Sequence, residues 1–150
     1  MPMYMTSWTI NSPVQTVWEA VTDLQMFALA TGTRIEALTE GPFAVGTRWK
    51  EYHSTFGRES AAEWEVTRME EPTSYRCESD GMGNHWVYDT FLAPEGVGTR
   101  MITITELSPN GLGARVGNPI VWPLFSLMLR RSYVKFEADF VNWVESGKRT

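Results

Sequence analysis

Residues 60–107 read SAAEWEVTRMEEPTSYRCESDGMGNHWVYDTFLAPEGVGTRMITITEL, and this stretch predicts consecutive antiparallel strands. Short segments rich in Thr, Val, Ile, Trp and Tyr alternate in it with turn residues, among them Pro72, Gly81 and Gly96. Short strands separated by tight turns are typical of a meander. Two earlier segments continue the pattern, so we predict six successive strands, at residues 34–40, 47–56, 60–70, 74–79, 85–93 and 98–107.

One more strand and two short helices are expected before this meander. Residues 3–11 are rich in β-forming side chains and predict an opening strand. Ser12 and Gln15 have the spacing of a capping box, so we expect a helix from this point to about Asp23. A second short helix is predicted over residues 24–29.

The C-terminal part predicts a loop and a long helix. Residues 108–118, SPNGLGARVGN, contain three glycines and predict a loop that gates any neighbouring pocket. A helix should begin near Val121 or Pro123 and continue to Ser146. Its apolar side chains fall near one stripe, made of Phe125, Leu129, Phe136, Phe140 and Trp143.

The composition limits the possible functions. The 150 residues include 43% apolar and 21% charged side chains, which suits one compact domain spanning residues 1–150. The net charge of −5 argues against a nucleic-acid partner, because phosphate binding needs clustered Lys and Arg. The single cysteine, Cys77, excludes an internal disulfide framework and fits a reducing compartment.

No targeting signal or membrane span is predicted. The N-terminal residues lack the basic and long apolar regions of a signal peptide. The most hydrophobic run, residues 120–129, is half of the roughly 20 residues that a spanning helix needs. We therefore expect a cytoplasmic protein with no stable membrane insertion.

A long helix packed on a curved sheet leaves a gap between the two. The straight helix and the concave face cannot stay in contact along their whole length. The gap is either filled by side chains or left as a cavity, and a cavity there would be the default ligand site. The seven Trp, seven Phe and five Tyr residues could wall such a cavity or plug it.

Five motifs in sequence order give the chain its resemblance to a known family. They are SPVQTVWEAVTD at 12–23, GPFAVGTRW at 41–49, VTRMEEP at 66–72, GTR at 98–100 and FEADFVNWVE at 136–145. Their order resembles the START-like, helix-grip superfamily (SRPBCC), in particular its polyketide cyclase/dehydrase-like branch. The resemblance implies an α+β fold. In it, a curved seven-stranded antiparallel sheet, two short N-terminal helices and one long C-terminal helix enclose a cavity.

The resemblance also implies which side chains face that cavity. Trp49 would point inward, as the bulky residue does in similar proteins, and alternation then sets the other strands. On the last strand, hydrophobicity favours Ile102 and Ile104 inside, whereas the GTR motif favours Met101 and Thr103, which we adopt. The expected ligand-binding residues are Trp49, Trp64, Tyr75, Trp86, Tyr88, Thr90, Met101, Thr103, Phe125, Met128, Leu129 and Phe136.

With Trp49 pointing inward, Glu51 and His53 are the only two inward side chains that could act together as an acid and a base. Side chains two apart on a strand lie about 6.5–7 Å apart at the backbone, so the two could share a substrate proton. The alternatives are a solvated pair without turnover, or a register that points both outward. Cys77 is expected to be an apolar filler. His53, His85 and Cys77 lie on three strands without ligand spacing, so we expect no metal and no cofactor.

Three functions of different classes remain open. The first is binding or carriage of a small hydrophobic ligand, aromatic, polyketide or lipid-like, without catalysis. The second is a cyclase, aromatase or dehydratase that uses Glu51 and His53. The third is a module that docks a membrane or a protein through residues 120–129. The sequence does not predict the ligand or the oligomeric state.

Overall fold

The computed structural model describes residues 3–55 and 57–147. In chain order its elements are β1 (Met3–Ile10), α1 (Val14–Val21), α2 (Leu24–Thr31), β2 (Arg34–Ala37), β3 (Arg48–Thr55), β4 (Arg58–Glu70), β5 (Ser74–Gly81), β6 (Asn84–Glu95), β7 (Gly98–Pro109) and α3 (Leu112–Glu145). The predicted seven strands, two short helices and long C-terminal helix are confirmed. The last residue predicted for the third strand, Phe56, lies outside the described residues.

All seven strands form one antiparallel sheet in the order β1-β7-β6-β5-β4-β3-β2. The meander supplies β2 to β7, and the opening strand completes the sheet by pairing with β7. This pairing brings the start of β7 against the end of β1. A Cβ atom on Gly98 would lie 2.5 Å from the carbonyl oxygen of Ile10, so only glycine fits there.

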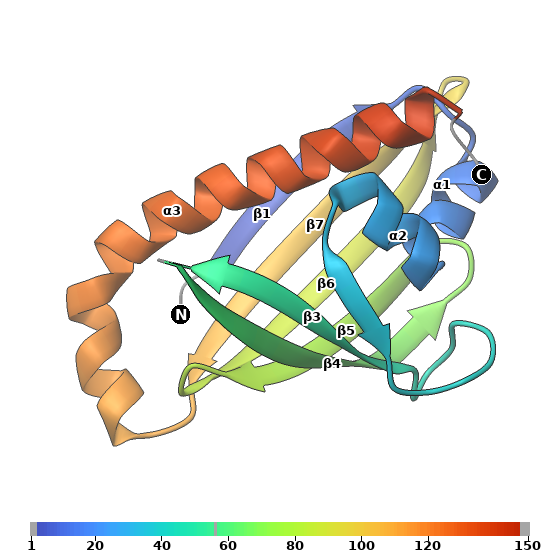
Figure 1. The fold of residues 1–150 in the computed structure, drawn as a ribbon. Helices are drawn as coiled ribbons and strands as arrows, with labels where there is room; N and C mark the ends of the chain where they lie inside the picture. The colour runs from blue at the N-terminus through green and yellow to red at the C-terminus, as the bar shows by residue number, and fades with distance from the viewer. Residues whose placement is uncertain (1–2, 56, 148–150) are drawn as a thin grey trace.

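The helices cover one face of the sheet (Figure 1). α3 runs along this face, while α1 and α2 lie together near the C-terminal end of α3. We call this covered face the inner face. No helix in the described part of the chain is long and apolar enough to cross a membrane.

The start of α1 differs from the prediction, whereas α2 begins at Leu24 as predicted. The capping box is wrong, because α1 starts at Val14 with Pro13 at its N-cap and no side-chain bond. Instead, the backbone carbonyl of Ser12 accepts a 2.7 Å hydrogen bond from the Thr99 hydroxyl of β7. The side-chain cap is found on α2 instead, where Asp23 accepts from the two backbone N–H groups at positions 25 and 26.

The glycine-rich loop prediction is also wrong, because α3 begins at Leu112 and is 34 residues long. A single glycine inside a helix costs only about 1 kcal/mol, and Gly113 and Gly117 are a turn apart rather than adjacent. Pro119 and Pro123 both lie inside the helix. Each removes one N–H donor and leaves a carbonyl of the preceding turn without its intrahelical partner.

The buried side of β7 is the one that the GTR motif favours. Met101, Thr103 and Thr105 are 3%, 3% and 6% exposed. Ile102 and Ile104 lie on the opposite face and are half-buried. Thr99 and Leu107 continue this buried side, which therefore carries three threonine hydroxyls beside a methionine and a leucine.

Candidate functional site

Aromatic side chains fill most of the space between the sheet and the helices. Phe27 of α2 packs against Phe136 and Phe140 of α3, with ring centroids 5.1 and 5.9 Å apart. Trp18 of α1 makes an edge contact with Tyr75 of β5 at 6.2 Å. The gap is therefore closed at the end where α1 and α2 lie.

Two small cavities remain on the inner face. The volume of the α2-side cavity is only about 10 Å³. It is lined by Val21, Phe27, Tyr75, Tyr88, Thr90, Met101, Phe136, Glu137 and Phe140. About 10 Å³ is the room that one water molecule needs, so a larger ligand requires the aromatic rings to move.

The β1-side cavity lies further toward the start of α3. Its volume is about 30 Å³. Its lining is predominantly apolar and comes from both layers: Tyr4, Trp86, Thr105 and Leu107 of the sheet, and Trp122, Ser126, Leu129 and Tyr133 of α3. The long helix is thus the cover of this cavity.

Glu137 places a carboxyl group inside the core, where sequence reasoning had no candidate. It is 2% exposed and lines the α2-side cavity. One of its oxygens accepts a 2.8 Å hydrogen bond from the Thr103 hydroxyl, and the other accepts from the Trp8 indole N–H. Its spacing could have revealed it, because it follows Tyr133 by four residues and precedes Phe140 by three, on the same helix face.

Thr90 supplies a second polar group to the α2-side cavity. Its side chain is 1% exposed, and its hydroxyl oxygen has no partner in hydrogen-bond geometry among the described residues. The Tyr75 hydroxyl lies within reach of it: burial raises the pKa of Tyr75, and a loose hydrogen bond with Thr90 lowers that pKa in opposition. Tyr88 lies on the same wall, and burial raises the pKa of its hydroxyl well above the usual value. Tyr88 therefore remains a neutral hydrogen-bond donor at every physiological pH.

Glu51 and His53 come together as an ion pair, although they line neither cavity. The Nε2 atom of His53 lies 3.3 Å from a carboxylate oxygen of Glu51. The hydrogen bond to Glu51 raises the pKa of His53 against the opposing effect of burial. Glu51 also accepts a 3.0 Å bond from the Trp49 indole. The His53 side chain is 48% exposed, so the pair lies at the rim of the inner face.

The other predicted ligand-binding residues divide into three groups. Seven line a cavity: Tyr75, Tyr88, Thr90, Met101 and Phe136 on the α2 side, and Trp86 and Leu129 on the β1 side. Three are buried or half-buried in the core without lining either cavity: Trp49, Trp64 and Thr103. Phe125 packs against Trp122 at 6.1 Å, and Met128 is 36% exposed. Met128 departs from the prediction because it lies one residue, or about 100° of helix, from Leu129.

Cys77 is buried among apolar side chains, and burial raises the pKa of its thiol well above the usual value. A thiol kept protonated in this way is a poor nucleophile. No group of three or more His, Cys, Asp or Glu side chains in the described ranges is arranged to hold a metal ion.

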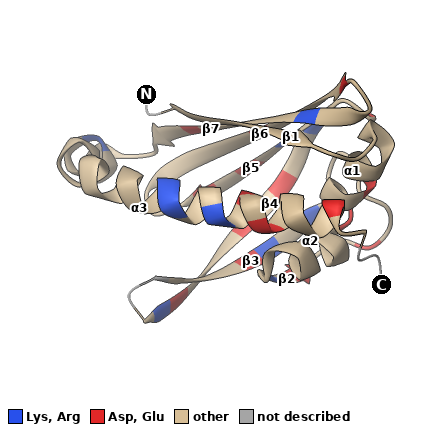
Figure 2. Cartoon of the chain, turned by 90° about the horizontal axis from the view of Figure 1, so that it is seen from above, with Lys and Arg blue, Asp and Glu red and all other residues tan. Residues whose placement is uncertain are grey.

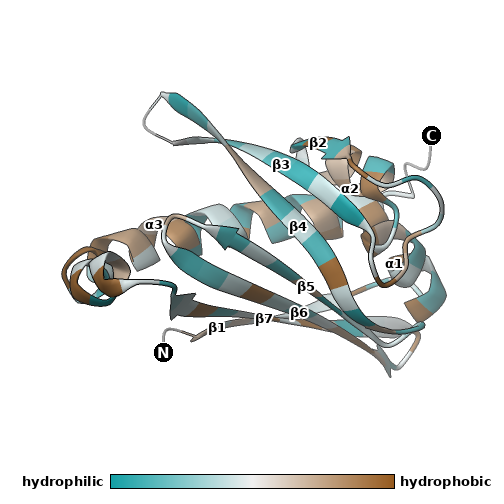
Figure 3. Ribbon diagram, turned by 90° about the horizontal axis from the view of Figure 1, so that it is seen from below, coloured by the Kyte–Doolittle hydropathy of each residue, from teal (hydrophilic) through white to brown (hydrophobic). Residues whose placement is uncertain are grey.

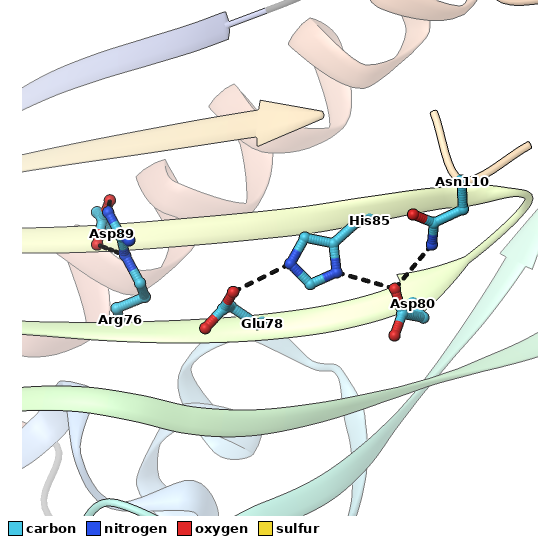
Figure 4. A network of polar contacts seen from close by, with 6 residues as sticks. All are labelled: Arg76, Glu78, Asp80, His85, Asp89 and Asn110. Carbon is cyan, nitrogen blue, oxygen red and sulfur yellow. Dashed lines mark hydrogen bonds and ion pairs between the residues drawn. The ribbon is translucent and has the colours of Figure 1, made fainter. Parts of the chain in front are cut away.

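A polar network occupies the opposite, outer face of the sheet (Figure 4). His85 lies between two acids, with Nδ1 2.8 Å from Asp80 and Nε2 3.0 Å from Glu78. Hydrogen bonds to Asp80 and then Glu78 raise the pKa of His85. Nearby, Arg76 donates two hydrogen bonds of 2.8 and 2.7 Å to Asp89. This network ties β5 to β6 and faces away from both cavities.

Comparison with known proteins supports the fold and leaves the activity open. No family model matches the sequence, and no curated protein matches it. Solved structures do match. The protein TTHA0849 from Thermus thermophilus superimposes with a TM-score of 0.80 at 14% identity, over 99% of this chain and 100% of that one. Ara h 8.0201 gives 0.73 at 16% identity, over 97% and 98%.

A third similar structure is DynU16, a protein in the dynemicin biosynthetic locus. It matches with a TM-score of 0.70 at 18% identity, over 97% of this chain and 48% of that chain. All these identities are too low to transfer a function, but the shared architecture extends over nearly the whole described sheet and all three helices. This chain therefore has the helix-grip fold that its motifs predicted.

Proposed function

We propose that this chain binds a small, mostly apolar molecule between the sheet and α3. The observation that carries the proposal is the Thr90 hydroxyl, which is buried against the α2-side cavity without a well-formed hydrogen bond. An orphaned buried hydroxyl costs about 1–3 kcal/mol, and a ligand that offers it a hydrogen bond removes this cost. Tyr88 of β6 and Glu137 of α3 line the same cavity from its two opposite layers.

The chemistry of the two cavities indicates the class of ligand. The apolar walls suit an aromatic, polyketide or lipid-like body, while Thr90, Tyr88 and Glu137 suit a hydroxyl or carbonyl group at one end. The aromatic rings that fill the gap must swing aside when such a ligand enters. Similarity to Ara h 8.0201 and to DynU16 is consistent with this class of ligand. That the chain forms a single domain and that the protein lies in the cytoplasm both stay predictions from the sequence.

The binding proposal is tested with 1-anilinonaphthalene-8-sulfonate, an apolar fluorescent probe. In this proposal the apolar body of the ligand extends from the α2-side cavity into the β1-side cavity. Ser126 lines the latter, so Ser126→Phe should block the space for that body. Ser132, on an exposed position of the same helix, gives the matched control Ser132→Phe. We expect saturable probe fluorescence in the native protein, at least about tenfold weaker binding in the plugged variant and unchanged binding in the control. Equal binding by all three proteins would contradict the proposal.

A second candidate function is a cyclase, aromatase or dehydratase. Its supporting observation is the 3.3 Å contact of Glu51 with His53, whose raised pKa lets it exchange a proton near neutrality. The pair would act on a substrate that reaches from the inner face to the rim. Incubation with a poly-β-carbonyl thioester, followed by mass spectrometry, tests this function. Turnover that is undiminished in His53→Ala would exclude the pair.

A further inference from the structure

The outward side of α3 carries an exposed apolar stripe in its first half. We define the outer stripe as Leu112, Val116, Ile120, Leu124 and Leu127, whose spacings of four and three residues place them on one side of the helix. Their exposed fractions range from 51% for Leu127 to 81% for Leu112. Figure 3 shows hydrophobic segments in this half of α3.

Packing within the chain does not explain the outer stripe. The opposite side of the same segment carries Trp122, Ser126 and Leu129, which line the β1-side cavity. The segment therefore has two apolar sides, one against the sheet and one open to solvent. An exposed apolar patch of this kind marks an interaction surface.

The charges beside the outer stripe all have one sign. Residues 112–136 contain four cations and no Asp or Glu, in a chain whose net charge is −5. Figure 2 shows the corresponding blue bands on α3 ahead of its red ones. Lys135 pairs with Asp139 at 3.1 Å. Arg115, Arg130 and Arg131 form no ion pair within the described residues.

This charge distribution selects the partner. A symmetric dimer formed through the outer stripe would bring the same arginines of two copies together, with no acid in the segment to neutralise them. An anionic lipid surface supplies both the apolar layer and the negative charge. A helix with an apolar side and flanking cations lies in the plane of such an interface.

We propose that the first half of α3 docks the protein on an anionic lipid membrane. The outer stripe enters the boundary between headgroups and acyl chains, and Arg115, Arg130 and Arg131 contact the headgroup phosphates. Docking is peripheral, and it places the helix that covers the β1-side cavity directly against the bilayer. The interaction itself does not depend on a ligand in that cavity.

Co-sedimentation of the full chain with vesicles tests the proposal. We expect binding to phosphatidylcholine vesicles containing about 30 mol% phosphatidylglycerol and much weaker binding to pure phosphatidylcholine. Binding should weaken in about 0.5 M NaCl. Ile120→Ser with Leu124→Ser should reduce the partition coefficient roughly a hundredfold, about tenfold per side chain. Arg130→Gln with Arg131→Gln should reduce it about 30-fold.

The matched control is Val45→Ser with Val97→Ser, since both valines are exposed apolar residues outside α3. It should bind like the native protein, and so should Ser126→Phe, which separates docking from cavity binding. No sedimentation with anionic vesicles, or equal sedimentation of the stripe variant, would overturn the proposal. So would a dimer in sedimentation velocity that the stripe variant dissociates, because the outer stripe would then belong to a second copy.

Discussion

Replacing Thr90 by valine should make the protein more stable. The two side chains have nearly the same shape, and the Thr90 hydroxyl is buried without a well-formed hydrogen bond among the described residues. Removing a buried, unpaired hydroxyl returns about 1–2 kcal/mol of the free energy of unfolding. For a chain of this length, the melting temperature should rise by roughly 2–6 °C.

Thr103 provides a control beside Thr90 on the neighbouring strand. The two residues are paired in the register of β6 with β7, and both are buried. The Thr103 hydroxyl, however, donates a 2.8 Å hydrogen bond to Glu137. Thr103→Val should therefore lower the free energy of unfolding by about 1–3 kcal/mol.

Urea unfolding, followed by tryptophan fluorescence, measures the free energy of unfolding of both variants. The two values are comparable when the dependence on urea concentration (the m-value) is the same. The prediction requires opposite signs for the two substitutions. If Thr90→Val destabilised the protein as much as Thr103→Val does, the hydrogen bond between the Thr90 and Tyr75 hydroxyls would be well formed in solution. Its assignment to ligand recognition would then fail.

Three further predictions concern the framework around the site. The pKa of His85 is raised in the folded protein, so its ion pairs stabilise the fold fully below the unfolded pKa of 6.5, and this stabilisation is lost as the pH rises through the folded pKa. The pKa values of Asp80 and Glu78 are lowered, so the same stabilisation is also lost in acid, when these carboxylates become protonated. His85→Gln should thus lower the free energy of unfolding by about 0.5 kcal/mol near pH 5.5, a small effect because the side chain is one-third exposed, and by almost nothing at pH 9; a constant difference would contradict this. Asp89→Ala should cost about 2–4 kcal/mol in urea unfolding, because it leaves Arg76 without both of its hydrogen bonds, and a loss below about 0.5 kcal/mol would show that the pair is dispensable. Gly98→Ala should cost about 1–3 kcal/mol, because its Cβ would meet the Ile10 carbonyl at 2.5 Å. Gly113→Ala, whose Cβ meets no atom within 4 Å, should instead raise the free energy of unfolding by up to about 1 kcal/mol, because alanine is the better helix former.

The sheet was predictable because its signals are local. Each strand carries alternating β-forming residues between turn residues, and the pattern needs no knowledge of distant contacts. The side of β7 that faces inward could be predicted only from the GTR motif, because the hydrophobicity of Ile102 and Ile104 favours the opposite side. The start of α3 was harder to predict, since glycines and prolines that usually break a helix are tolerated near its exposed start, whereas its end near Ser146 was predicted.

The interior of the site could be predicted only in part. The cavity-lining faces of β5 and β6 follow from alternation, so Tyr75, Tyr88 and Thr90 were placed on the inner wall. The size of the cavities was not predictable, because it depends on how Phe27 of α2 meets the aromatic rings of α3. The spacing of Glu137 places it on the apolar side of α3, but its role there also depends on the hydrogen bonds from Trp8 of β1 and Thr103 of β7, which the sequence alone does not show.

Native mass spectrometry of the intact chain with a panel of flavonoids, aromatic polyketides and fatty acids is the most direct test of ligand binding between the sheet and α3. We predict a one-to-one complex with at least one compound class, retained by Ser132→Phe and lost by Ser126→Phe, which fills the β1-side cavity. The bound compound should also raise the melting temperature of the native protein. A panel that yields no complex, or complexes that form equally well with the plugged variant, would contradict binding at this site.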